Sequence, residues 1–320
     1  MRLEEPVATL ATRLAQRRAW PRLTDTSRES IAAYVFLLPW LLGLVGLTLG
    51  PILASLWVSF TRYDLVSAPR WIGLQNYADL PTDGRYLQSV RVTLVYVLLE
   101  VPLRLCFALG LALLLNRGQR GLDLYRAVYY LPSLLGGSVA IAVLWRQLFG
   151  PDGMVNLMLA SIGWANPPTW LHDPRFALYT LVLLGVWQFG SPMIIFLAGL
   201  RQIPREIYES AQVDGASRVA QFFRITLPLL TPLILFNLVL QIIGAFQAFT
   251  AAFIVSGGTG GPVDSTLLYT LYVYEQAFGF LHMGYATAMA WILLLAVAVI
   301  TAAIFSSSRY WVFYMEQSGP

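Results

Sequence analysis

The sequence contains no lysine, and all 21 of its basic residues are arginine. A P-loop ATPase needs the lysine of its GxxxxGK[ST] motif, which contacts the phosphates of the nucleotide. The chain therefore cannot be a standard ATPase, and any work driven by ATP must be done by another subunit.

Cysteine and histidine are almost as scarce. The single cysteine, Cys106, lies in an apolar stretch and excludes a disulfide within the chain. His172 and His282 stand far apart without cysteine neighbours, so the sequence suggests no metal site. We find no nucleophile–base constellation and no glycine-rich nucleotide fingerprint. We therefore expect no enzymatic activity of the chain's own and no bound cofactor.

Charged residues are also few. They make up 12% of the chain, against about a quarter in an average soluble domain. Hydrophobic residues make up 57%, and the mean hydropathy is +0.63. The composition predicts an integral membrane protein, and its net charge of +4 requires no nucleic-acid partner.

Six stretches are long enough to cross a membrane as helices, which takes about 20 predominantly apolar residues. They are residues 31–59, 90–115, 124–149, 177–200, 227–255 and 284–306. The sequence therefore predicts an all-α membrane protein with six transmembrane helices.

The arginines of the connections and tails indicate the orientation, because cytoplasmic loops are enriched in basic residues. One side of the predicted spans carries Arg2, Arg13, Arg17, Arg18, Arg22, Arg28, Arg117, Arg120, Arg126, Arg201, Arg205, Arg218, Arg224 and Arg309. The other side carries only Arg62, Arg70, Arg85, Arg146 and Arg175. We therefore expect both termini, and the connection between spans four and five, to be cytoplasmic.

That fourth connection, residues 201–228, is a polar interruption of the apolar sequence and reads RQIPREIYESAQVDGASRVAQFFRITLP. Pro204 suits the first turn of a helix, and Glu209 follows close enough to its positive end to be favoured there. Gly215 can take a positive φ at the helix C-terminus, and Ser217 can cap a second short helix. The pattern predicts a helix–turn–helix at the cytoplasmic membrane surface; an ordinary polar loop is the alternative.

The spacing of Glu209-Ser210-Ala211, Gly215 and Leu227-Pro228 resembles the "EAA" loop of permease subunits from binding-protein-dependent ABC importers. Shorter elements are similar to the carbohydrate-type (maltose and multiple-sugar) branch of that family. They are Trp71–Tyr77, Tyr130–Pro132, Trp145–Asn156, Phe246–Phe249, Gly260–Pro262 and Met283–Ala286. The likeness extends over most of the chain from Tyr34, although Ser210 replaces the family's middle alanine and the glycine-rich turn is longer.

The resemblance implies a division of labour among subunits. Two permeases form the pathway, two cytosolic ATPases bind their EAA loops, and an extracytoplasmic solute-binding protein delivers the solute. By position, the contact with the ATPase falls to Glu209, Ser210, Ala211, Asp214 and Gly215. The family also implies a multi-pass protein among the lipids of a prokaryotic cytoplasmic membrane, with ATP and magnesium bound by the partner ATPase.

Polar residues within the spans are candidates for contact with the solute, because polar groups at the centre of a bilayer are costly and usually face an interior cavity. Amide hydrogen bonds to hydroxyl groups, beside an aromatic face, suit a sugar. The candidates are Trp187, Gln188, Asn237, Gln241, Gly244 and Gln247. The alternative is that these amides only hold helices together. Glu100 and Arg104, spaced i, i+4 in span two, favour a structural pair or a subunit contact over a solute site.

The sequence thus predicts a permease for a di- or oligosaccharide or a sugar derivative, paired with a second permease. We expect a cytoplasmic tail at 1–30, a transmembrane domain at 31–309 and a second tail at 310–320. Glycerol phosphate, a polyol or another small solute is the nearer alternative. A stand-alone secondary transporter is the other; it would need an inverted repeat and intramembrane carboxylates, and we find no repeat and only Glu100.

Overall fold

The computed structural model describes residues 25–116, 122–164 and 166–313, and they are mostly helical. The chain divides into two units, residues 1–57 and 58–320. The first unit contains α2 (Asp25–Gly43) and the π-helical η2 (Leu44–Leu49), followed by α3 (Gly50–Ser59), which runs into the second unit. Helical residues from Ala33 to Ser59 are apolar enough to form one membrane span of 27 residues. The expected tails lie largely outside the described residues.

The second unit begins with a short hairpin. Strands β1 (Thr61–Arg62) and β2 (Arg70–Trp71) pair antiparallel, and α4 (Gln75–Asp79) with the 3-10 turn η3 (Leu80–Thr82) follows. The buried amide of Asn76 donates hydrogen bonds of 2.8 and 2.9 Å to the carbonyls of Ser59 and Thr61. This amide therefore fastens α4 to the chain that enters the hairpin.

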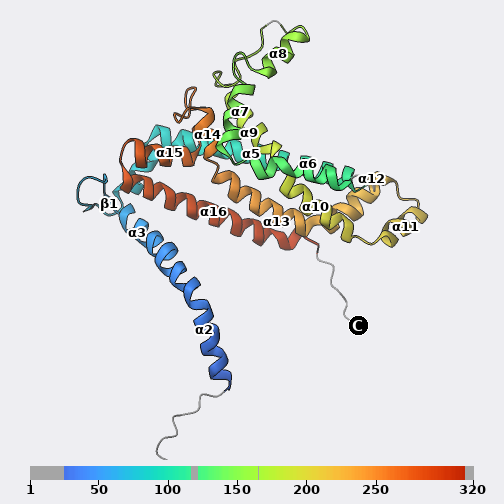
Figure 1. The fold of residues 1–320 in the computed structure, drawn as a ribbon, viewed down its shortest axis with the longest axis horizontal. Coiled ribbons are helices and arrows are strands. Elements are labelled where there is room, and N and C mark those ends of the chain that lie inside the picture. The colour runs from blue at the N-terminus through green and yellow to red at the C-terminus, as the bar shows by residue number, and fades with distance from the viewer. Residues whose placement is uncertain (1–24, 117–121, 165, 314–320) are drawn as a thin grey trace, which may run out of the picture. The chain divides into compact units, whose positions relative to one another are not determined.

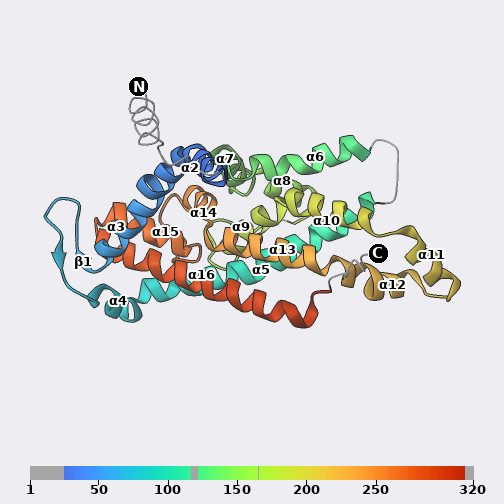
Figure 2. The ribbon, with the colours of Figure 1, turned by 90° about the horizontal axis from the view of Figure 1, so that it is seen from below.

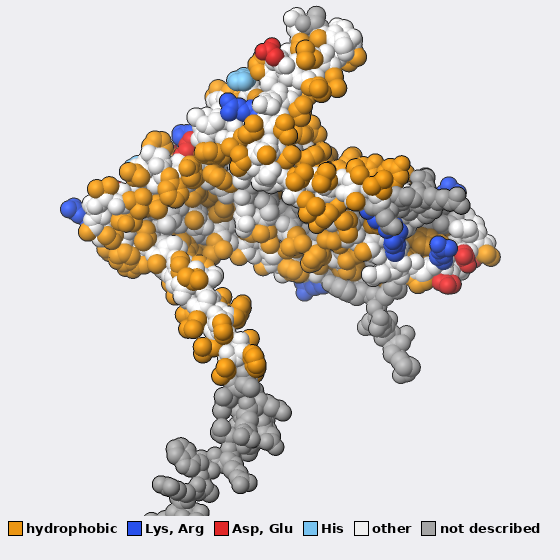
Figure 3. Space-filling model, viewed as in Figure 1, with side chains coloured by type: hydrophobic (Ala, Val, Ile, Leu, Met, Phe, Trp, Pro, Cys, Tyr) orange, Lys and Arg blue, Asp and Glu red, His pale blue; other side chains and the backbone are white. Residues whose placement is uncertain are grey.

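The core of the second unit forms around α5 (Gly84–Leu115), which packs against α9 (Ala177–Trp187), α10 (Gly190–Gln202) and α13 (Leu227–Phe246). α16 (Met283–Trp311) lies beside α13, as both views show (Figures 1 and 2). The largest side chains buried between these helices include Leu181, Leu184, Met193, Phe196, Leu230 and Met289. The face seen in Figure 3 is largely apolar, which suits a lipid environment.

Two of the expected spans are bent rather than straight. α6 (Leu122–Leu135) and α7 (Val139–Leu148) meet at 97° across Gly136 and Gly137, and α9 and α10 meet at 42°. Pro132 lies inside α6 and Pro192 inside the first turn of α10. Pro192 removes a helical hydrogen bond to the carbonyl of Gln188, four residues earlier, which bends the chain between α9 and α10. The α6–α7 bend lies beyond Pro132, at the two glycines. The described residues thus contain four single helices that could cross a membrane, or six spans if each bent pair counts as one.

The remaining short elements lie near the two ends of the second unit or connect its helices. They are α8 (Met154–Ser161), α11 (Arg205–Val213), α12 (Arg218–Gln221), π-helical η4 (Phe222–Thr226), α14 (Thr250–Val255), α15 (Tyr269–Tyr274) and π-helical η5 (Glu275–Gly279). Figures 1 and 2 place α11 and α12 at one end of this unit and β1 at the opposite end. Charged side chains gather over α11 and α12 in Figure 3.

Candidate functional site

The polar connection folds as two short helices at a tight turn. α11 begins at Arg205, so Pro204 occupies the N-cap position, one residue before the expected first turn. Ser217 caps α12, as its hydroxyl accepts a hydrogen bond from the amide of Ala220. The hydroxyls of Tyr208 and Thr226 lie 2.9 Å apart and connect α11 to η4. These contacts make the loop a braced unit that projects from the membrane helices.

Gly215 makes the turn between the two helices possible. Its φ is +79°, a region that other residues adopt only at a cost. The amide of Gly215 donates to the carbonyl of Gln212, and the amide of Ala216 donates to the carbonyl of Ala211. This pair of bonds is a Schellman motif, which satisfies carbonyls left free at the end of α11.

The residues expected to contact an ATPase lie on the surface of this loop. Glu209, Ser210, Asp214 and Gly215 are exposed and Ala211 is half-buried. Three apolar side chains, which the sequence motif does not include, are exposed beside them: Val213, Val219 and Phe223. Their exposed fractions are 89%, 66% and 59%, so the loop exposes three large apolar side chains beside charged ones.

A polar cavity of about 180 Å³ lies between α5, the α6–α7 bend, α9 and α13. Gln188 and Gly244, from two different predicted spans, both line it, together with Glu100, Arg104 and Phe249. The amide of Gln188 donates to the carbonyls of Gly136 and Leu184 at 3.3 and 3.4 Å. The cavity thus combines amide, charged and aromatic groups inside the helix bundle.

The other four candidates from the spans do not line this cavity. Asn237 is fully buried, and its amide donates to the carbonyl of Leu233 one turn earlier. The ring of Trp187 packs against Trp145, with 6.2 Å between the ring centres. Gln241 is half-buried and Gln247 is exposed at the end of α13. The helical face predicted for α13 therefore contributes only Gly244 and, beyond its end, Ala248 to the cavity.

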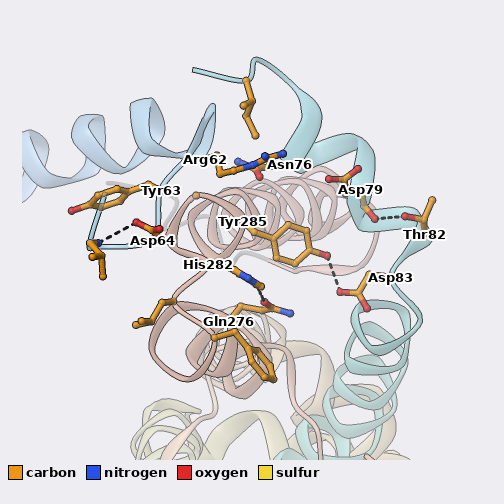
Figure 4. A pocket seen from close by; sticks show the side chains of 15 residues that line it. Arg62, Tyr63, Asp64, Asn76, Asp79, Thr82, Asp83, Gln276, His282 and Tyr285 are labelled. Carbon is orange, nitrogen blue, oxygen red and sulfur yellow. Dashed lines mark hydrogen bonds between the residues drawn. The ribbon is translucent and has the colours of Figure 1, made fainter. Parts of the chain in front are cut away.

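A second, larger pocket of about 770 Å³ lies at the end of the unit opposite to α11 (Figure 4). It is lined by residues of the hairpin, α4, η3, η5 and the start of α16. The carboxylate of Asp83 accepts hydrogen bonds of 2.6 and 2.9 Å from the hydroxyls of Tyr272 and Tyr285. His282 Nδ1 lies 3.0 Å from the side-chain oxygen of Gln276. No sequence motif predicted this pocket, because its walls come from segments about 200 residues apart.

Asp83 also caps the start of α5, accepting from the amides of Arg85 and Tyr86. Partial burial raises the pKa of this carboxyl, but the hydrogen bonds from Tyr272, Tyr285 and the two amides outweigh burial. Its pKa therefore lies below the usual value for aspartate, and the group stays ionised at neutral pH.

Comparisons with known proteins show which family the chain belongs to. The family model described as "Binding-protein-dependent transport system inner membrane component" matches residues 105–313. The chain is 52% identical over 288 residues to the probable ABC transporter permease protein YesP of Bacillus subtilis (strain 168), covering 90% of this chain and 93% of the relative. It is 34% identical to the lactose transport system permease protein LacF of Rhizobium radiobacter, covering 90% and 99%.

A solved structure has the same fold. A chain of a bacterial alginate ABC transporter, crystallised in complex with an alginate pentasaccharide-bound periplasmic protein, superposes with a TM-score of 0.78. The match covers 90% of this chain and 97% of that one, at 24% sequence identity.

Proposed function

Because the chain belongs to the family of binding-protein-dependent transport system inner membrane components, we propose that it is one permease of an ABC importer for a sugar. It forms half of the membrane pathway for a di- or oligosaccharide or a derivative, beside a second permease. Two ATPases bind the cytoplasmic side of the permease pair, and an extracytoplasmic protein delivers the solute. The proposal places both termini in the cytoplasm, with a transmembrane domain over residues 31–309.

The exposed loop of α11 and α12 is the observation that carries the proposal. It is capped at both helices, braced to η4, and leaves Val213, Val219 and Phe223 uncovered. Large apolar side chains left exposed on a projecting loop are typical of a docking surface. Because α10 leads into α11 after two residues, a displacement of the loop by a closing ATPase would move the bent helix pair α9 and α10.

The cavity around Gln188 and Gly244 supports a sugar as the solute. It offers the amide of Gln188 and the ring of Phe249 together, which suits hydroxyl groups and the apolar face of a sugar ring. The relatives named for lactose and for alginate support the same class of solute.

Co-purification from the native membrane tests the proposal. Wild-type protein should bring down a second permease and a Walker-containing ATPase. Gly215→Arg should reduce the recovered ATPase by about tenfold, because a side chain at φ +79° costs about 1–2 kcal/mol and the new side chain covers the contact surface. The matched control is Gly163→Arg, another exposed glycine at positive φ with open space around it, in the connection on the opposite side.

A wild-type chain that purifies alone and moves solute into liposomes without ATP would contradict the proposal. That result would favour the stand-alone secondary transporter instead. Equal loss of the ATPase in both glycine variants would place the contact elsewhere than on α11 and α12.

A further inference from the structure

The bend between α9 and α10 leaves one backbone carbonyl without its helical partner. In a straight helix the carbonyl of Gln188 would accept from the amide of residue 192. That residue is Pro192, which has no N–H. Inside a membrane there is no bulk water to replace the bond, and an unsatisfied backbone group costs several kcal/mol.

Side chains from two other helices donate hydrogen bonds to this carbonyl. Arg104 of α5 donates from Nε and Nη2 at 3.1 and 2.7 Å. Ser133 of α6 donates from its hydroxyl at 2.8 Å and accepts from the amide of Ser191 at 2.9 Å. The bend is therefore held by α5 and α6 at the same time, through one oxygen atom.

Glu100 keeps the arginine in place. Its Oε1 lies 3.0 Å from Arg104 Nη1, and the Glu100 side chain is 1% exposed. Gly185 of α9 lies against this pair, because a Cβ there would come within 2.6 Å of Glu100 Cγ. The charge of the guanidinium is thus balanced, and all three of its nitrogens have a hydrogen-bonding partner within the bundle.

The bend lies on the path between the cavity and the cytoplasmic loop. The side chain of Gln188 lines the cavity, and α10 leads from the bend towards α11. We propose that Arg104 is a positioning residue for transport: it holds the bend rigid, so that α9 and α10 turn together with α5 and α6 when the ATPase displaces the loop. This inference rests on the proposed function.

A thiol probe in the cavity tests it without knowledge of the solute. Gly137 lines the cavity, and a Cβ there meets nothing within 4 Å, so Gly137→Cys adds a reporter without a clash. Cys106, which is exposed, is changed to serine. The importer is purified with its ATPase and binding protein. Alkylation by a membrane-impermeant maleimide is then compared between the nucleotide-free and the ATP–vanadate-trapped states.

With Arg104 present, trapping should change the alkylation rate. Arg104→Lys and Arg104→Gln should both reduce this change by about tenfold, the scale of one charge-assisted hydrogen bond, while ATP hydrolysis continues. Lysine keeps the charge but cannot hold the carbonyl with two nitrogens of one planar group. Arg91→Lys, an exposed position on the same helix, is the control and should behave as wild type.

Adding Pro192→Ala to Arg104→Gln separates positioning from simple stabilisation, because alanine restores the amide that the carbonyl lacks. The double variant should regain thermal stability but not the response to trapping. Recovery of both, or an unchanged response in Arg104→Lys, would overturn the inference and leave Arg104 a purely structural residue. A wild-type complex without any ATPase would instead contradict the proposed function.

Discussion

Two glutamate–arginine pairs of equal length lie in different surroundings. Glu100 and Arg104, the inner pair, are 3.0 Å apart inside the bundle, with 1% and 17% of their side chains exposed. Glu275 and Arg85, the outer pair, are also 3.0 Å apart, near the larger pocket that Asp83 lines, with 16% and 38% exposed. Arg85 has a second acid, Asp264, at 2.8 Å, whereas no second acid is recorded within 4 Å of Arg104 among the described residues. Distance alone therefore does not decide what a pair contributes.

The surroundings of each ion pair decide how much it contributes to stability. The inner arginine also donates two of the three hydrogen bonds that the carbonyl of Gln188 accepts from side chains, so its loss would leave Ser133 alone on that carbonyl. The outer arginine shares its charge between two acids and reaches solvent. A buried pair is costly to break from one side, whereas exposed pairs contribute little.

The largest effect should come from breaking the inner pair. Glu100→Gln leaves the Arg104 charge without its counterion and should lower the free energy of unfolding by about 3–5 kcal/mol. The same substitution at the outer pair, Glu275→Gln, should be nearly neutral at pH 7, because Arg85 keeps Asp264. Thermal unfolding of the purified protein in detergent measures both. Equal losses in the two variants would show that burial is not what separates the pairs.

Packing around the inner pair gives a second, smaller contrast. Gly185→Ala would place a methyl group 2.6 Å from Glu100 Cγ and 3.0 Å from the hydroxyl of Tyr96. Overpacking of this kind costs about 1–3 kcal/mol. Gly110→Ala, in α5 with nothing within 4 Å, should instead stabilise the helix by about 0.5–1 kcal/mol. Opposite shifts in melting temperature are expected, and two shifts of the same sign would contradict the close contact at Gly185.

The sequence alone predicted the parts that depend on local chemistry. The turn at Gly215 and the cap at Ser217 follow from residue types and spacing, and the structure has both. It also favoured a structural role for Glu100 and Arg104, and the structure pairs them. Their partner, the Gln188 carbonyl, could be found only by asking which amide Pro192 lacks, and which helix replaces that amide is a matter of packing.

The same limit applies to the candidate residues on α13. A regular spacing puts Asn237, Gln241 and Gly244 on one helical face, but neighbouring helices decide which part of that face is open. Asn237 is buried where other helices cover α13, and only Gly244 of the three lines the cavity. The larger pocket could not be predicted at all, because Asp83 and Tyr285 are 202 residues apart in the sequence and meet only in the folded chain.

The stability of the protein should depend on pH through two carboxyl groups near the larger pocket, those of Glu275 and Asp83. Burial raises the pKa of Glu275, and the attraction of Arg85 only partly offsets it. The charge of Glu275 therefore costs stability above its folded pKa, and the cost disappears as the pH falls through that value. Asp83 behaves in the opposite sense: its folded pKa is lowered, so its contribution is complete above the unfolded pKa and is lost as the pH falls through the folded one.

On acidification from pH 7, stability should first rise slightly with Glu275 and then fall with Asp83. Glu275→Gln should remove the rise and Asp83→Asn the fall. At pH 7, Asp83→Asn should cost about 1–3 kcal/mol, since the single amide oxygen can accept either from the two tyrosines or from the helix amides of Arg85 and Tyr86, and the charge is lost. Melting temperatures measured across the acid range, with Asp152→Asn as an exposed control, test the order of the two steps. If Asp83→Asn leaves the loss of stability at acid pH unchanged, the tyrosine hydroxyls do not stabilise the ionised carboxylate. The hydrogen bonds of Asp83 would then add no pH dependence to the stability of the fold.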